Sequence, residues 1–129
     1  PIPLADLSVG IDLTGLAPKS STLARRQMQG RHILGVEGNG FTLSFSNATS
    51  DIRRIDWRHG ILAGLKNMQF HQHFNANAQP ARLIGVELGS RSSPMFRSRR
   101  AVYGDASVYA SGAAIIPRAE ERPEVKAAL

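Results

Sequence analysis

The stretch that decides the fold is FHQHFN, residues 70–75. Alternate side chains of a β-strand share one face, so a strand here would place His71, His73 and Asn75 together. If that face looks into a barrel, two imidazoles line a pocket. Neutral imidazole is the commonest metal ligand, but one strand cannot complete a metal site, which needs about three or four convergent ligands.

Other short strands surround this stretch. LSVGIDL (7–13) and FTLSFSN (41–47) alternate between apolar and polar residues, ARLIGVELG (81–89) is a further strand candidate, and EGNG (37–40) is a tight-turn signal. About seven or eight strands, with turns every 8 to 12 residues, predict an all-β sandwich or barrel. Only PEVKAAL (123–129) indicates a helix, because proline suits the first helical position.

The composition is that of an ordinary globular domain. Of 129 residues, 42% are hydrophobic and 20% are charged. With no cysteine, disulfides and thiolate metal sites are excluded. No apolar run approaches the roughly 18 residues that cross a bilayer, so we expect a cytoplasmic protein that does not interact with membranes.

The net charge of +6 favours anionic partners. Much of the excess lies in two arginine clusters, at 25–31 and 91–100. The second cluster, RSSPMFRSRR (91–100), contains no nucleic-acid motif and is typical of a solvated loop. Binding to nucleic acid is therefore supported by charge alone, and we do not expect it.

Several motifs together resemble one family. GILAGLKNMQFHQHFN (60–75) is similar to the second motif of the cupins, in which a glycine and a spacer precede His-xxx-Asn. The resemblance continues in EGNGFT (37–42), RIDWRHG (54–60), NAQPARLIGVELGS (77–90) and the tail from Ser111 to Leu129. It implies a double-stranded β-helix, the small jelly-roll barrel, with a short C-terminal helix.

The resemblance also implies a metal held by two histidines and a glutamate of the first motif and by the histidine of the second. Aligning the first motif on Gly38 places its His-x-His on Arg25 and Gln27 and its glutamate on Arg31. Of the four ligand positions, only His71 then keeps the ligand residue. Arginine offers no lone pair and stays charged, whereas its planar fork suits carboxylate or phosphate.

Two functions follow for this barrel. In the first, a cupin-like domain with a degenerate metal site binds a small organic anion through Arg25, Gln27, Arg31, His71 and His73, or serves as a structural or interaction domain. No cofactor is expected in that case. In the second, a metal-dependent, dioxygenase-like enzyme holds iron, manganese, nickel or zinc through His71 and His73, joined by His32 or Gln27. The residues leave open whether the protein is an enzyme.

We expect one cupin-like domain over residues 1–129, with a barrel core over 7–90, a loop over 91–112, and a strand and helix over 113–129. The resemblance implies a homodimer. Alternatively, the chain is one half of a longer two-cupin protein and pairs with its partner cupin domain.

Overall fold

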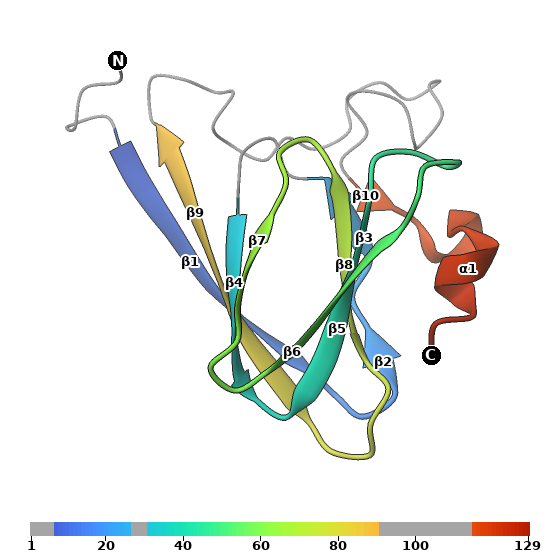
Figure 1. The fold of residues 1–129 in the computed structure, drawn as a ribbon, viewed down its shortest axis with the longest axis horizontal. Coiled ribbons are helices and arrows are strands. Elements are labelled where there is room, and N and C mark those ends of the chain that lie inside the picture. Colours follow the sequence, from blue (N-terminus) through green and yellow to red (C-terminus); the bar gives the residue numbers. More distant parts are fainter. Residues whose placement is uncertain (1–6, 27–30, 91–114) are drawn as a thin grey trace.

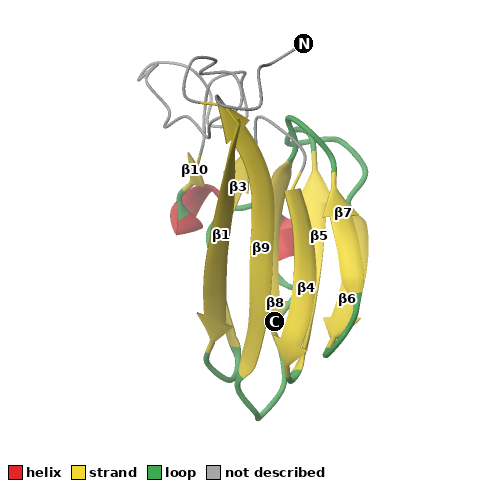
Figure 2. Ribbon diagram, turned by 90° about the vertical axis from the view of Figure 1, so that its left-hand side faces the viewer, coloured by secondary structure: helices red, strands yellow, loops and turns green. Residues whose placement is uncertain are grey.

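Two antiparallel β-sheets face each other and form the body of the protein (Figures 1 and 2). The computed structural model describes residues 7–26, 31–90 and 115–129, without the side chains of 7–10 and 88–90. The four-stranded sheet has the order β1 (Leu7–Leu16), β9 (Ala81–Ser90), β4 (Arg31–Glu37) and β7 (Leu62–Leu65).

The six-stranded sheet lies opposite. Its order is β10 (Ile115–Ile116), β3 (Ala24–Arg26), β8 (Phe70–Asn75), β5 (Asn39–Phe45) and β6 (Arg53–Arg58), and β2 (Ser20–Ser21) also pairs with β8. The EGNG turn forms the hairpin between β4 and β5, in which Gly38 has a φ of 69°. Such a positive φ is the reason for glycine at this turn.

The two sheets converge at one end of the molecule and diverge at the other (Figure 1). At the convergent end β1 finishes with Leu16 and β9 begins with Ala81. These residues belong to a buried apolar cluster between the sheets, which also contains Ile33, Trp57, Leu65 and Leu83. This cluster fixes the spacing of the sheets and leaves the divergent end for polar residues.

A second apolar cluster lies on the outer face of the six-stranded sheet. Its phenylalanines stack in pairs across neighbouring strands: the Phe41 and Phe74 rings are 4.9 Å apart, and the Phe45 and Phe70 rings 5.7 Å apart. The C-terminal residues cover this face, with Val125 of helix α1 (Pro123–Lys126) buried against it (Figure 1). Both faces of the sheet are therefore packed.

The C-terminal residues form a short strand, a 3-10 turn and a helix. Strand β10, a 3-10 turn η3 (Arg118–Glu120) and α1 follow one another, and Arg122 donates hydrogen bonds to the carbonyls of Asn47 and Ser50. The predicted loop over 91–112 lies outside the described residues. Among the helices that are described, none has the length and apolar character needed to cross a membrane.

Candidate functional site

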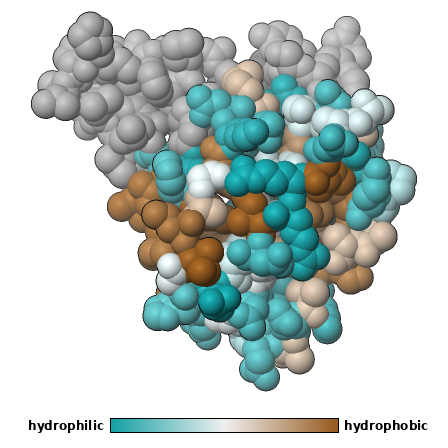
Figure 3. Space-filling view, viewed as in Figure 1, coloured by the Kyte–Doolittle hydropathy of each residue, from teal (hydrophilic) through white to brown (hydrophobic). Residues whose placement is uncertain are grey.

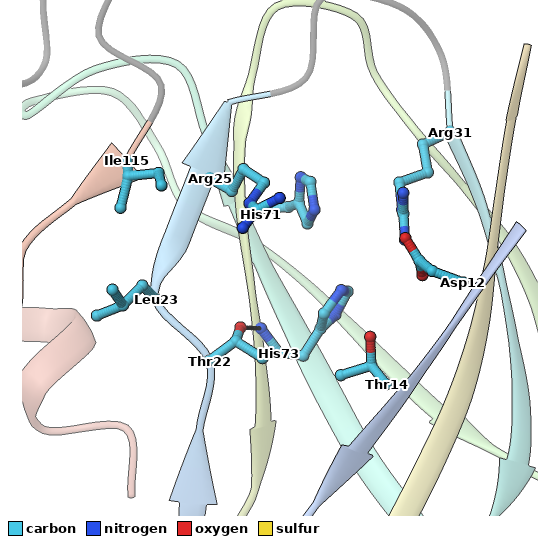
Figure 4. A pocket seen from close by; sticks show the side chains of 9 residues that line it. All are labelled: Asp12, Thr14, Thr22, Leu23, Arg25, Arg31, His71, His73 and Ile115. Carbon is cyan, nitrogen blue, oxygen red and sulfur yellow. Dashed lines mark hydrogen bonds and ion pairs between the residues drawn. The ribbon is translucent and has the colours of Figure 1, made fainter. Parts of the chain in front are cut away.

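A cavity of about 410 Å³ lies between the divergent ends of the two sheets. Figure 4 shows that side chains from both sheets line it, and that the two histidines of β8 project from its wall. The lining residues are Asp12, Thr14, Thr22, Leu23, Arg25, Arg31, His71, His73 and Ile115. Four of the five predicted site residues are among them, and Gln27 lies outside the described residues.

His71 and His73 face the cavity because β8 alternates, as the sequence predicts. Both side chains are buried, and their ring centres are 5.2 Å apart. Nδ1 of His73 lies 2.7 Å from Oγ1 of Thr42, whereas Nδ1 of His71 is buried without a hydrogen bond. An unpartnered buried nitrogen costs free energy, so this wall of the cavity is suited to a bound polar group.

Both histidines are neutral at physiological pH. Burial lowers the pKa of His71 well below its ordinary value, and the neighbouring His73, Arg31 and Arg25 lower it further. Burial and then the charge of Arg31 lower the pKa of His73 to about 4, against a smaller opposite effect of Asp12. Each ring can therefore donate one hydrogen bond and accept one.

Arg31 points into the barrel from the first residue of β4. Its guanidinium is almost fully buried, 2.5 Å from a carboxylate oxygen of Asp12 and 3.6 Å from one of Glu87. It lies directly over Gly85, where an added Cβ would come within 1.9 Å of the guanidinium nitrogen. Glycine at position 85 thus leaves the space that the arginine occupies, and the two carboxylates more than offset its single positive charge.

Arg25 differs from Arg31 in having no such partner. It stands directly opposite His71 in the pairing of β3 with β8, so both side chains share the cavity face. Its side chain is exposed at the cavity mouth. Within residues 7–26, 31–90 and 115–129, no carboxylate lies within ion-pair distance of it, so its guanidinium is available to pair with an anion.

The donor set does not fit the transition metal that the sequence resemblance implies. The described residues contain no group of three histidine, cysteine, aspartate or glutamate side chains that could hold a metal ion. Two arginines stand beside the imidazoles instead, and a guanidinium repels a cation. His32 is exposed on the outer face of the four-stranded sheet, because Arg31 and Ile33 face inward. The expectation that His32 could join the histidine pair is therefore wrong.

Asp12 and Glu87 were not among the predicted site residues, yet both contact Arg31. Asp12 stands between Ile11 and Leu13, a pattern that ordinarily indicates a solvated polar position. The pairing register brings both carboxylates to the arginine, since Asp12 lies opposite Gly85 and Glu87 opposite Arg31. The signal in the sequence is a single carboxylate between apolar residues in each strand, and this pattern does not by itself distinguish the cavity from the solvent.

Comparison with known proteins identifies the fold. No protein-family model matches the chain, and no curated protein matches it. Among solved structures, oxalate oxidase superposes with a TM-score of 0.56 at 14% identity, over 64% of this chain and 42% of that one. A Cupin 2 conserved barrel domain protein from Salinispora arenicola CNS-205 gives 0.53 at 16%, over 67% of each chain.

A third similar structure is Drosophila melanogaster CENP-C bound to CAL1, with a TM-score of 0.52 at 10% identity, over 58% of this chain and 61% of that one. The matched part thus spans less than two thirds of the CENP-C and oxalate oxidase chains. At such identities the likeness shows the fold alone. The protein has a cupin fold, which confirms the predicted all-β jelly-roll barrel with a short C-terminal helix. That fold occurs both in an oxidase and in a domain that binds another protein.

Proposed function

We propose that this protein is a cupin-fold binding domain whose barrel cavity takes a small organic anion. The observation that carries the proposal is the position of Arg25, which faces the cavity opposite His71 without a carboxylate partner among the described residues. An arginine presents a planar pair of N–H donors that matches a carboxylate. Arg25, Arg31, His71 and His73 form the binding residues, and Gln27 is proposed with them from the sequence.

The size and chemistry of the cavity support a small carboxylate. Pockets for small ligands commonly measure about 300 to 1,000 Å³, and this one measures about 410 Å³. Arg31 is held by Asp12 and Glu87, whose two charges exceed its own, so it contributes fixed N–H donors and no net positive charge, and Arg25 is the guanidinium that can pair with the anion. One structural neighbour, oxalate oxidase, is known in complex with its substrate analogue glycolate, which belongs to the ligand class proposed here.

The proposal predicts that Arg25→Gln weakens carboxylate binding at least about tenfold, because a charge-assisted hydrogen bond is lost. Calorimetric titration with glycolate, oxalate, malonate and succinate measures the effect. Arg58→Gln is the matched control, since Arg58 is exposed at the end of β6 and outside the cavity lining. It removes the same net charge and should leave binding unchanged.

Two results contradict the proposal. The first is that no carboxylate binds, or that Arg25→Gln and Arg58→Gln bind equally well. The second is stoichiometric iron, manganese, nickel or zinc in protein purified without added metal, lost in His71→Ala. That second result would favour the alternative, a metal-dependent enzyme that uses His71 and His73.

We also propose that residues 1–129 form one cytoplasmic domain that pairs with a second copy through the outer face of the four-stranded sheet. Pairing register aligns two mostly apolar rows across this face. Ile11, Leu13 and Leu62 expose 70%, 61% and 66% of their surface. In Figure 3 hydrophobic residues gather on the side of the molecule where β1 and β9 lie. The rows are Ile11–Val86–His32–Gly64 and Leu13–Ile84–Leu34–Leu62.

A second copy is the occupant that suits this face best. The two rows contain no aspartate, glutamate, lysine or arginine, and a two-fold axis would set this patch against its own copy. Sheets also stack face to face at about 10 Å through apolar side chains. The same face would suit the partner domain of a two-cupin chain.

Dimerisation through this face predicts that Leu13→Glu weakens self-association more than about tenfold, because the symmetric contact would bury two unpaired carboxylates. Sedimentation equilibrium measures the dimer constant. Met68→Glu is the control, because Met68 is 41% exposed in the turn between β7 and β8, away from the rows. A wild-type protein that stays monomeric, or a Leu13→Glu dimer of unchanged stability, contradicts the proposal.

A further inference from the structure

Three buried side chains from adjacent strands form a hydrogen-bonded chain that ends at the cavity. Nε1 of Trp57, on β6, donates to Oγ1 of Thr42, on β5, at 3.1 Å. The same Oγ1 lies 2.7 Å from Nδ1 of His73, on β8. Each of the three residues is at most 4% exposed. Glycine at position 40 makes room for the indole, because an added Cβ would meet the Trp57 ring at 2.4 Å.

Counting protons along this chain fixes the direction of its hydrogen bonds. The indole nitrogen of tryptophan can only donate, so Oγ1 of Thr42 accepts from Trp57. The threonine hydroxyl has one proton of its own, and in the described part of the chain its only acceptor is Nδ1 of His73. If Nδ1 carried a proton, two donors would face each other across 2.7 Å or the hydroxyl proton would be buried without a partner.

We infer that Trp57 and Thr42 hold neutral His73 as the tautomer protonated on Nε2, so that the cavity wall presents an N–H donor there. Nδ1 accepts from Thr42, and the single ring proton is therefore on the other nitrogen. An Nε2–H group recognises an oxygen acceptor such as a carboxylate oxygen. The ligand class rests on the proposed function, whereas the tautomer follows from the three buried side chains alone.

The same arrangement opposes a metal at His73. A histidine that binds metal through one ring nitrogen ordinarily donates a proton from the other to a carboxylate or carbonyl. In this protein Nδ1 of His73 faces the Thr42 hydroxyl, whose oxygen already accepts a hydrogen bond from Nε1 of Trp57. Coordination through Nε2 would move the ring proton to Nδ1 and leave the Thr42 proton without an acceptor. Trp57 and Thr42 are thus positioning residues that set which kind of ligand His73 can meet.

The tautomer is measured directly by long-range proton–nitrogen NMR on ¹⁵N-labelled protein near neutral pH, without ligand or metal. We expect a protonated Nε2 and an unprotonated Nδ1 for His73 in the wild type. A protonated Nδ1 overturns the inference, and this measurement needs no variant.

Two substitutions at Thr42 test the cause. Thr42→Ser keeps the hydroxyl and should keep the tautomer, whereas the isosteric Thr42→Val removes the hydroxyl and should let the other tautomer appear. Glycolate and oxalate should bind Thr42→Val between about two- and tenfold more weakly than Thr42→Ser, as expected for one misaligned hydrogen bond.

An Nε2–H tautomer that is the same in Thr42→Val and in the wild type would show that Trp57 and Thr42 do not set it. If the wild type and Thr42→Ser keep the tautomer, Thr42→Val loses it, and no carboxylate binds to any of them, the proposed function fails while the tautomer assignment stands. The NMR and binding measurements therefore separate the two claims.

Discussion

Asn75→Ala should lower the free energy of unfolding by about 3 kcal/mol, through the loss of several buried hydrogen bonds. Asn75 is fully buried at the end of β8. Its Nδ2 donates to the carbonyl of Gln79 at 2.7 Å and to that of Leu16 at 3.2 Å, and its Oδ1 accepts from the backbone N–H of Asn77 at 3.0 Å. One side chain thereby joins the β8–β9 turn to the end of β1.

The alanine variant would leave these backbone groups buried without partners, which costs more than the bonds themselves contribute. For a chain of this size the midpoint of thermal unfolding should fall by roughly 10 to 20 °C. Thermal and urea unfolding followed by circular dichroism measure both quantities.

Two further variants identify the cause. Asn75→Asp keeps the oxygen that Asn77 uses but turns a donor toward the carbonyls into an acceptor, so it should be at least as unstable as Asn75→Ala. Asn77→Ala removes one exposed hydrogen bond, from the Asn77 side chain to the carbonyl of Asn39. It should lower the free energy of unfolding by less than about 1 kcal/mol. Equal stability of Asn75→Ala and Asn77→Ala would show that Asn75 does not hold the turn.

The histidine strand shows what could be predicted from the sequence. The two-residue period of residues 70–75 placed His71 and His73 on one face, and the motif match placed that face inside a barrel. Both are found at the cavity. Aligning the first motif also predicted that Arg25 and Arg31 face the barrel interior, and both line the cavity. The alignment is informative because the pairing of jelly-roll strands largely determines which residues face inward.

Strand β1 shows what could not be predicted. Its alternation suggests that Ile11 and Leu13 face a core, yet they lie exposed while Asp12 and Thr14 line the cavity. Likewise Phe41, Leu43 and Phe45 pack outside the barrel, beneath the C-terminal residues. Period fixes which residues share a face, but it does not say which face is inward when a polar cavity and a second apolar layer are both present.

The three charged side chains around Gly85 show how the cavity can hold arginine where the resemblance implies a metal ligand. Arg31 is buried, and burying a charge is costly unless it is paired. Asp12 and Glu87 supply that pairing, and a glycine supplies the space. The arginine is therefore built into the barrel by residues from two other strands, β1 and β9. Such a fixed group can orient a ligand without itself being reorganised.

Acidification should destabilise the protein through its buried histidines. The pKa of His73 is lowered from 6.5 in the unfolded chain to about 4 in the fold. Above pH 6.5 both states are neutral, and the full stability is present. As the pH falls from 6.5 to about 4, His73 binds a proton in the unfolded state but not in the folded state, so the free energy of unfolding decreases. His73 alone should lower the free energy of unfolding by about 3 kcal/mol across this pH window.

His71 should add to this loss, because burial and the neighbouring His73, Arg31 and Arg25 lower its pKa well below the ordinary value. Urea unfolding at several pH values between about 7.5 and 4 measures the slope. His73→Gln removes this titrating group and should reduce the loss of unfolding free energy across the window by about 3 kcal/mol. His59→Gln, at an exposed turn, is the control for replacing a histidine outside the cavity.

Carboxylates that are paired in the fold also lose stability in acid, so the difference between His73→Gln and the wild type is the informative quantity. Parallel curves for these two proteins would mean that His73 takes up its proton at the same pH in the folded and the unfolded protein. Because a protonated ring cannot accept from Thr42, the neutral Nε2–H donor would then be lost as the pH falls through 6.5 and not through about 4. The same measurement therefore tests a stability effect and the hydrogen-bonding state on which ligand recognition by His73 depends.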